Sequence, residues 1–205
     1  VGYVLGNYMP RDGVDGSSSI GTIQPNGARQ SFMYKGKPCR INTYGNSFTQ
    51  CNQVNDGETW EEYLGSFLQE PIRNYGVGGY SVYQAYRRMR AVERDGPHRA
   101  SHIILNIWED DHCRNLDAWR RIRFGRATSC GFTLPHLRVD RACETFEERE
   151  NLCPTPADVH RLCDPDWVCG IFHDDPLLAM VLNERGTVPS GKRGADPVPL
   201  SVGLT

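Results

Sequence analysis

The triplet Gly45-Asn46-Ser47 stands directly after a short apolar run that ends at Tyr44. A serine on a sharp turn between a strand and a helix exposes its hydroxyl group, which can attack a carbonyl carbon. The N–H groups of such a turn can hold the oxyanion that develops during acyl transfer. An ordinary loop is the alternative for a small, turn-prone triplet, and the rest of the chain favours the first interpretation.

Two later apolar segments end in residues of unusual type. One ends in the glycine-rich stretch 74–79, and the other ends in the polar stretch 108–112. Ligands bind beyond the carboxyl ends of the strands in an open α/β sheet, so we expect all three ends to meet at one rim. Glycine allows a close backbone approach and a second N–H donor, and a polar side chain could complete an oxyanion hole. These are the parts of an acyl-transfer site.

The segments between these ends alternate between strand and helix. Residues 57–69 and 81–95 show the helical period, with Thr59 expected to cap the first helix. The first helix is expected to have one apolar face made of Trp60, Leu64, Phe67 and Leu68, and the second one made of Val82, Tyr86 and Met89. The nearly continuous apolar run 103–108 predicts a parallel strand buried on both faces. Residues 39–109 are therefore predicted to form an α/β fold with right-handed crossovers.

The remaining segments give weaker patterns. Residues 1–37 are expected to be an extension that is loop up to residue 30, with a weak strand at its start, followed by a hairpin that leads into the first strand of the core. The α/β core is expected over 38–126. Its Arg-rich end, 114–126, is expected to form a helix with a solvated face, and a patch that binds an anionic substrate or nucleic acid is the alternative. Residues 127–190 are predicted as an irregular, Cys-rich segment with short helices over 155–163 and 174–186, and 191–205 as a flexible tail.

Composition excludes some function classes. The chain has 205 residues, a net charge of -2 and 39% hydrophobic residues, which is typical of a globular domain and gives no field for nucleic acid or an anionic membrane. No run is long enough to span a membrane. The chain shows no signal peptide and begins without Met, so a processed chain or a fragment is expected.

The cysteines leave the compartment open. Five of the eight lie between residues 130 and 169. Disulfides or buried thiols are favoured over a metal site, because no CxxC pair occurs and the spacing around His160 is wide and irregular. No metal and no cofactor are therefore expected.

Three stretches resemble a known family. "YGNSFTQCNQVNDGETWEEYLG" resembles the first block of the SGNH, or GDSL-type, hydrolases, which is a Gly-Asp-Ser followed by a helix. "RNYGVGGYSVYQA" is similar to their second block, and "HIILNIWEDD" stands where their third block belongs. The resemblance implies a flavodoxin-like three-layer α/β/α sandwich with a parallel central sheet. A sandwich that is incomplete at its C-terminal end is included in this expectation. It also implies an esterase, acetylesterase or lipase-like activity on a small-molecule or carbohydrate ester.

The resemblance assigns roles to particular residues. Ser47 would be the nucleophile and Gly79 an oxyanion donor. Asn106 would be the third donor if the strand register differs from the direct alignment, which puts Glu109 in that place. The residues expected around the substrate are Asn46, Gly78, Trp108, Glu109 and Asp110.

The family's Asp-x-x-His block has no counterpart in the expected region, so the base stays open. The candidates are His112, His160 with Asp158 two residues before it, and His173. A non-catalytic carbohydrate-binding module on the same fold, or a truncated hydrolase, is the alternative. A metal enzyme built on residues 110–113 is disfavoured, since consecutive residues seldom converge on one ion.

Overall fold

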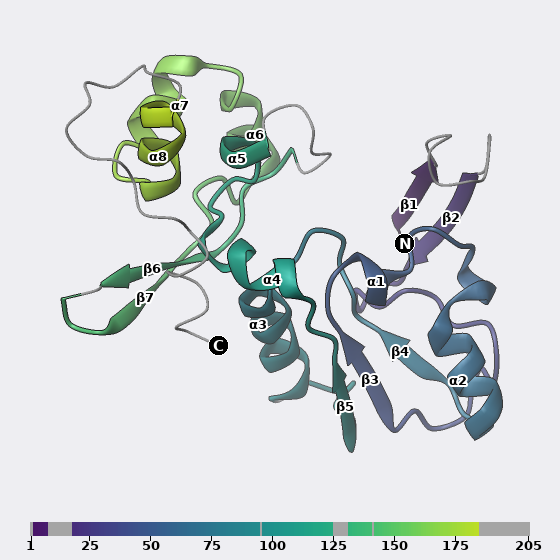
Figure 1. Cartoon of the computed structure of the whole chain (residues 1–205). Helices are drawn as coiled ribbons and strands as arrows, with labels where there is room; N and C mark the ends of the chain where they lie inside the picture. Colours follow the sequence, from purple (N-terminus) through teal and green to yellow (C-terminus); the bar gives the residue numbers. More distant parts are fainter. Residues whose placement is uncertain (1, 8–17, 95, 125–130, 141, 185–205) are drawn as a thin grey trace. The chain divides into compact units, whose positions relative to one another are not determined.

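The computed structural model describes residues 2–7, 18–94, 96–124, 131–140 and 142–184 (Figure 1). The chain divides into two compact units, Val1–Trp108 and Glu109–Thr205. The expected tail over 191–205 and Cys130 lie outside the described residues. In the part of the chain that the structure describes, no helix is long and apolar enough to cross a membrane.

A three-stranded parallel sheet forms the centre of the first unit. Its middle strand, β3 (Ile41–Tyr44), pairs with β4 (Ile72–Asn74) on one side and with β5 (His102–Leu105) on the other. Thr43 lies opposite Asn74, and Tyr44 lies opposite Leu105. The carboxyl ends of all three strands therefore lie at one edge, as predicted, and the fold is a mixed α/β fold.

Helices connect these strands in the predicted order. The short α1 (Ser47–Gln50) follows β3, and the 3₁₀ turn η2 (Asp56–Glu58) leads into α2 (Trp60–Leu68). Thr59 caps α2, as expected, by accepting a hydrogen bond from the N–H of Glu62. The helix α3 (Val82–Glu93) begins with a capping box between Ser81 and Gln84. Met89 and Val92 of α3 pack against Tyr44, Tyr75 and Ala28.

The buried faces of both helices differ from the prediction. In α2 the buried residues are Glu61, Glu62 and Gly65, while Phe67 is 85% exposed. Glu62 can be buried because its carboxylate accepts the N–H groups of Phe32 and Met33, both at 2.9 Å. In α3 the buried residues are Tyr83, Gln84 and Ala85, and Tyr86 is exposed. In α2 the buried face is therefore decided by specific polar partners of Glu62, which the periodicity of the sequence does not reveal.

The strand β5 is not buried on both faces, as the apolar run had suggested. It lies at the edge of the three-stranded sheet, and His102, Ile103 and Ile104 are exposed. A strand paired on one side only leaves its other edge open. The continuous apolar run therefore identified a parallel strand but not its burial.

The N-terminal region contains a hairpin that the sequence did not indicate in this place. β1 (Gly2–Asn7) lies at the start of the chain, where a weak strand was expected, and it pairs antiparallel with β2 (Ser18–Ile23), where loop was expected. The hairpin predicted around Gly36 is a turn instead, with Gly36 at φ +89°. Ala28 and Arg29, which follow β2, are buried and tie this region to the core.

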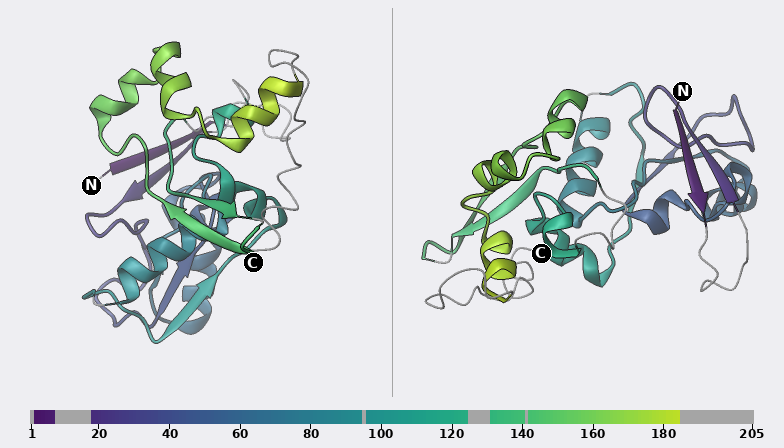
Figure 2. Two further views of the ribbon diagram at one scale, coloured as in Figure 1. Left: turned by 90° about the vertical axis from the view of Figure 1, so that its left-hand side faces the viewer. Right: turned by 90° about the horizontal axis from the view of Figure 1, so that it is seen from above.

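The second unit combines short helices with one hairpin. Residues 114–126, expected as one helix, contain the 3₁₀ turn η3 (Arg114–Leu116) and α5 (Arg121–Phe124) after α4 (Glu109–Cys113). The predicted irregular stretch holds the antiparallel pair β6 (His136–Asp140) and β7 (Thr145–Arg149), which lie side by side in Figures 1 and 2. The helices α6 (Pro156–Arg161) and α8 (Pro176–Glu184) match the two predicted ones, and α7 (Pro165–Ile171) was missed.

Buried apolar residues hold the second unit together. Trp119 stacks on Phe172, with ring centroids 5.9 Å apart, and Leu116, Leu137 and Leu177 are almost fully buried. All the described cysteines are free thiols, and Cys153 alone among them is buried. The described part of the unit is therefore stabilised by packing and, as shown below, by ion pairs.

Candidate active site

Ser47 is the first residue of α1 and lies just beyond the carboxyl end of β3. Asn46 is buried and caps this helix, because its side-chain oxygen accepts the N–H of Phe48 at 2.8 Å. The carbonyl of Ser47 accepts the N–H of Cys51 at 2.8 Å, and the Ser47 residue is half-buried. The predicted strand–turn–helix geometry is therefore present, and the side chain of Asn46 stabilises the turn by capping α1.

Gly45 brings the ends of β3 and β5 together. The N–H of Asn106 donates to the carbonyl of Tyr44 at 2.8 Å, directly beside the turn. A Cβ atom at Gly45 would overlap Thr49 Oγ1 and lie 3.0 Å from Asn106 Cβ. Since any side chain would collide with both neighbours, the turn requires glycine. Asn106 is consequently the residue that the end of β5 brings next to the Gly45-Asn46-Ser47 turn.

The end of β4 packs against α1. Asn74 donates from its side chain to the carbonyl of Thr49 at 2.5 Å and accepts the N–H of Gly76 at 2.9 Å. A Cβ at Gly76 would overlap the backbone N of Gln50 and lie 2.6 Å from the Thr49 carbonyl carbon. Asn74 and Gly76 therefore fix the distance between the second strand end and the helix that carries Ser47.

The next turn of this segment lies beside Ser47. A Cβ at Gly78 would be 3.9 Å from Ser47 Cβ, which is ordinary van der Waals contact. The N–H of Val77 donates to the carbonyl of Gly45 at 3.0 Å, so the segment is also tied to the Gly45-Asn46-Ser47 turn. Gly79 has φ +85°, a conformation that favours glycine. The structure thus brings Ser47, Gly78 and Asn106 to one rim of the first unit.

Two aromatic rings lie next to this rim. Phe48 and Trp108 make an edge-to-face contact with centroids 5.1 Å apart, and each is about half exposed, at 51% and 50%. Trp60 donates from its indole N–H to the carbonyl of Phe48 at 3.2 Å. The residue following Ser47 is therefore held in a fixed aromatic contact.

The two histidines of the first unit lie at the opposite end of the strands. His102 pairs with Ile41, the first residue of β3, and the carbonyl of His98 accepts from Asn42 at 2.8 Å. Neither side chain belongs to the rim that carries Ser47.

The predicted candidates for the base all belong to the second unit. His112 lies in α4, and its Nδ1 is buried without a hydrogen-bond partner among the described residues. His160 is exposed on α6, and His173 is exposed with Nδ1 2.8 Å from the carbonyl of Gly170.

Asp158 has a structural partner in the same helix. Its carboxylate accepts from the hydroxyl and the N–H of Thr155, and the hydroxyl bond lowers the pKa of Asp158. Residues two apart on a helix do not face one another, so Asp158 and His160 do not form an Asp–His pair within α6.

The acidic residues of α4 are engaged by arginine. Asp110 pairs with Arg114 at 2.6 Å, and Asp111 pairs with the same guanidinium at 2.8 Å. Glu109, aligned with the family's oxyanion asparagine, is exposed at the start of α4. No group of three or more His, Cys, Asp or Glu residues is arranged for a metal ion within the described ranges.

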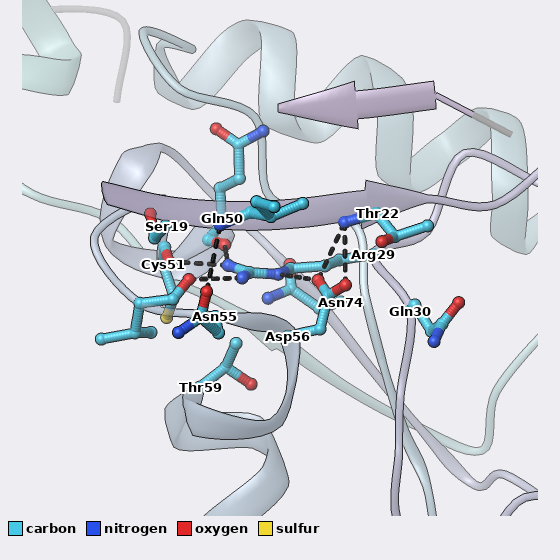
Figure 3. Close-up of polar contacts among 12 residues, drawn as sticks. Ser19, Thr22, Arg29, Gln30, Gln50, Cys51, Asn55, Asp56, Thr59 and Asn74 are labelled. Carbon is cyan, nitrogen blue, oxygen red and sulfur yellow. Dashed lines mark hydrogen bonds and ion pairs between the residues drawn. The ribbon is translucent and has the colours of Figure 1, made fainter. Parts of the chain in front are cut away.

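The sequence gives no sign of the role of Arg29, which holds the C-terminal end of α1. Its guanidinium is buried and donates to the carbonyls of Gln50, Cys51 and Val54, each at 2.6 Å, and to Asp56 at 2.8 Å (Figure 3). Its backbone N–H donates to the carbonyl of Asn74 at 2.7 Å. Arg29 thereby connects the C-terminal end of α1 with the end of β4. No pattern in the predicted loop over 1–30 signals this role.

A buried carboxyl lies beneath the same helix. Glu61 accepts from the hydroxyl of Thr43 at 3.1 Å and from the thiol of Cys51 at 3.7 Å. Burial raises the pKa of Glu61 to about 7 and that of Cys51 to about 11. The Cys51 thiol therefore stays protonated near neutral pH, and Glu61 titrates there.

Comparison with known proteins gives limited matches. No family of known proteins matches the sequence, and neither does any curated protein. A solved structure of AlinE4, described as an SGNH-hydrolase family esterase, is similar at 23% identity and a TM-score of 0.34, over 38% of this chain and 44% of that chain. Two mutants of the same esterase match at 22% and 21% identity with a TM-score of 0.34, each over 39% of this chain and 45% of theirs. The match thus spans less than half the length of these esterases.

Proposed function

We propose that this protein is a serine hydrolase that cleaves ester bonds of small molecules or carbohydrates, with Ser47 as the nucleophile. The observation that carries the proposal is the approach of two other strand ends to the Ser47 turn. A Cβ at Gly78 would touch Ser47 Cβ at 3.9 Å, and Asn106 lies against Gly45. A nucleophile flanked by glycine backbone and by a carboxamide side chain is suited to acyl transfer.

In the proposed reaction the hydroxyl oxygen of Ser47 attacks the ester carbonyl carbon, and its proton passes to a base. The N–H groups of Ser47 and Gly79 and the carboxamide of Asn106 donate to the oxyanion of the tetrahedral intermediate. Collapse of this intermediate breaks the ester bond, and the alcohol leaves with the proton from the base. Water then releases the acyl group from Ser47 by the same steps.

The proposed base is a histidine other than His98 and His102, because these two lie at the amino ends of the strands. The candidates are His112, His160 and His173, with Asp158 as a candidate orienting group. Asn46, Gly78, Trp108, Glu109 and Asp110 remain the proposed surroundings of the substrate. The finer fold proposal is a three-layer sandwich whose α/β core spans residues 38–126.

Hydrolysis of p-nitrophenyl acetate tests this function. Ser47→Ala should lower kcat by about 10³-fold or more, since it removes the attacking oxygen. Ser66→Ala is the matched control, because Ser66 is exposed on α2. Alanine at each of the three histidines should then identify the base. Equal rates for the parent chain and Ser47→Ala would overturn the proposal.

A non-catalytic carbohydrate-binding module is the second candidate. It is favoured by the half-exposed edge-to-face pair of Phe48 and Trp108, because aromatic rings stack on the apolar faces of sugars. Calorimetric titration of Ser47→Ala with neutral oligosaccharides would distinguish the candidates. Saturable binding that Trp108→Ala abolishes, together with an inactive parent chain, would favour the module.

A further inference from the structure

The side chain of Gln50 contacts the glycine turn beside Ser47. Its Oε1 accepts the N–H of Gly78 at 2.7 Å, and the residue is only 8% exposed. Gln50 stands three residues after Ser47 in α1, so both residues lie on the same side of this helical turn. One short helix therefore carries both the proposed nucleophile and an acceptor for the neighbouring turn.

The turn that receives this contact is closed by a backbone hydrogen bond. The N–H of Tyr80 donates to the carbonyl of Val77 at 3.1 Å, and Gly79 at the third position has φ +85°. These features are those of a type II turn, in which Gly78 and Gly79 are the two central residues. The central peptide group of this turn carries the N–H of Gly79, and the N–H that Gln50 accepts belongs to the residue just before it, Gly78.

Gln50 is itself fixed from behind. Its carbonyl accepts from the buried guanidinium of Arg29 at 2.6 Å, while its side chain extends away from that guanidinium (Figure 3). A Cβ at Gly78 would lie 2.9 Å from Gln50 Oε1, so the amide also occupies the space beside the turn. Gln50 thus links the position of Gly78 to α1, the same helix that positions Ser47.

We infer that Gln50 is a positioning residue that orients the Gly78-Gly79 turn toward Ser47, so that the Gly79 N–H points to the oxyanion. This inference rests on the proposed ester hydrolysis for its catalytic consequence, but the contact itself can be tested without activity. Gln50 touches neither the substrate nor the reacting atoms. It acts through the backbone of the turn.

Amide hydrogen exchange measures the contact directly. In the unmodified chain the Gly78 N–H should be protected although it lies in a turn. Gln50→Met keeps the length of the side chain but removes the acceptor, so exchange at Gly78 should accelerate by about tenfold or more. Gln50→Glu keeps an acceptor and should preserve the protection. Gln53→Met is the matched control, because Gln53 is exposed. An unprotected Gly78 N–H in the unmodified chain, or equal protection in Gln50→Met, would overturn the inference.

Kinetics on the same variants separates this inference from the proposed function. Loss of activity in Ser47→Ala establishes the hydrolase first. Gln50→Met should then lower kcat by about tenfold with little change in KM, because a misdirected donor weakens transition-state binding. An active, Ser47-dependent enzyme with unchanged kcat in Gln50→Met would refute the positioning role alone. A parent chain without Ser47-dependent activity would refute the proposed function, and the exchange result would still decide the contact.

Discussion

The two units bury their charged groups in different ways. In the first unit the buried guanidinium of Arg29 binds three backbone carbonyls and Asp56, and Glu61 is held by a hydroxyl and a thiol. In the second unit buried carboxylates pair with arginine, as in Asp117 with Arg123 at 2.7 Å and Asp175 with Arg138 at 2.9 Å. Buried polar groups therefore fix backbone near Ser47 in the first unit. In the second unit these carboxylates mainly join side chains, although Asp175 also accepts the N–H groups of Leu177 and Leu178.

The difference shows where the position of the backbone is controlled most strictly. A charge that binds backbone carbonyls determines where a chain segment lies, and the segment held by Arg29 is the end of α1. A side-chain ion pair links two elements with less control of either backbone. The first unit thus shows the more costly arrangement at the place where the proposed chemistry needs a fixed helix.

The largest expected effect is that of Arg29→Met. Removing this buried cation leaves Asp56 and three carbonyls without their partner, which should lower the free energy of unfolding of the first unit by about 3–5 kcal/mol. Arg40→Met is the control, because Arg40 pairs with Glu70 while its side chain is 59% exposed, and should cost under about 1 kcal/mol. Urea denaturation followed by Trp60 and Trp108 fluorescence measures both. Similar losses for the two variants would contradict the bracing role.

The second prediction concerns the pH dependence of the first unit. Burial raises the pKa of Glu61 from 4.5 to about 7, so the folded state binds more protons than the unfolded state between these values. The free energy of unfolding should therefore fall as pH rises from 4.5 to 7, by roughly 3 kcal/mol. Glu61→Gln should remove most of this slope. A slope unchanged in Glu61→Gln would assign the effect to another group.

The second unit should respond to pH in the opposite sense. Burial lowers the pKa of His136 from 6.5 to about 4, so its folded state favours the neutral imidazole. Stability is present above pH 6.5 and should be lost as pH falls toward 4, by roughly 2–3 kcal/mol. Fluorescence of Trp119 and Trp167, with the tryptophans of the first unit replaced by Phe, would follow this unit. Stability that changes with pH in the same direction in both units would contradict this difference between them.

The smallest effect is expected at a glycine of the second unit. Gly170 lies in α7, and a Cβ there would meet nothing within 4 Å. Gly170→Ala should therefore raise stability by about 0.5–1 kcal/mol, since alanine is the better helix former. Gly76→Ala, whose Cβ would overlap the backbone of α1, should instead lower it. Thermal unfolding of the two variants gives the sign, and a stabilised Gly76→Ala would contradict the tight packing around α1.

The sequence predicted those parts of the fold that depend on local chemistry. The turn at Gly45, the cap at Thr59 and the alternation of strands and helices along the first unit follow from residue types and spacing. The prediction from sequence failed where a partner far away along the chain decides whether a residue is buried. Glu62 is buried because two backbone N–H groups from residues 32 and 33 reach it.

The candidate site was predicted to a similar degree. Ser47, Gly78 and Asn106 are brought to one rim because each follows a strand end. Arg29 was missed because its partners lie 21 to 27 residues away along the chain. The hairpin of β6 and β7 was missed because the β7 residues are exposed on both faces and show no strand alternation.

The proposed function requires an activated hydroxyl at Ser47, and covalent labelling tests this requirement directly. A fluorophosphonate probe incubated with the folded chain should form one adduct, located at Ser47 by peptide mass spectrometry, with no adduct in Ser47→Ala. The label should form at the usual rate in Ser66→Ala. An unlabelled folded chain, or an adduct at another serine, would contradict the assignment of Ser47 as the nucleophile.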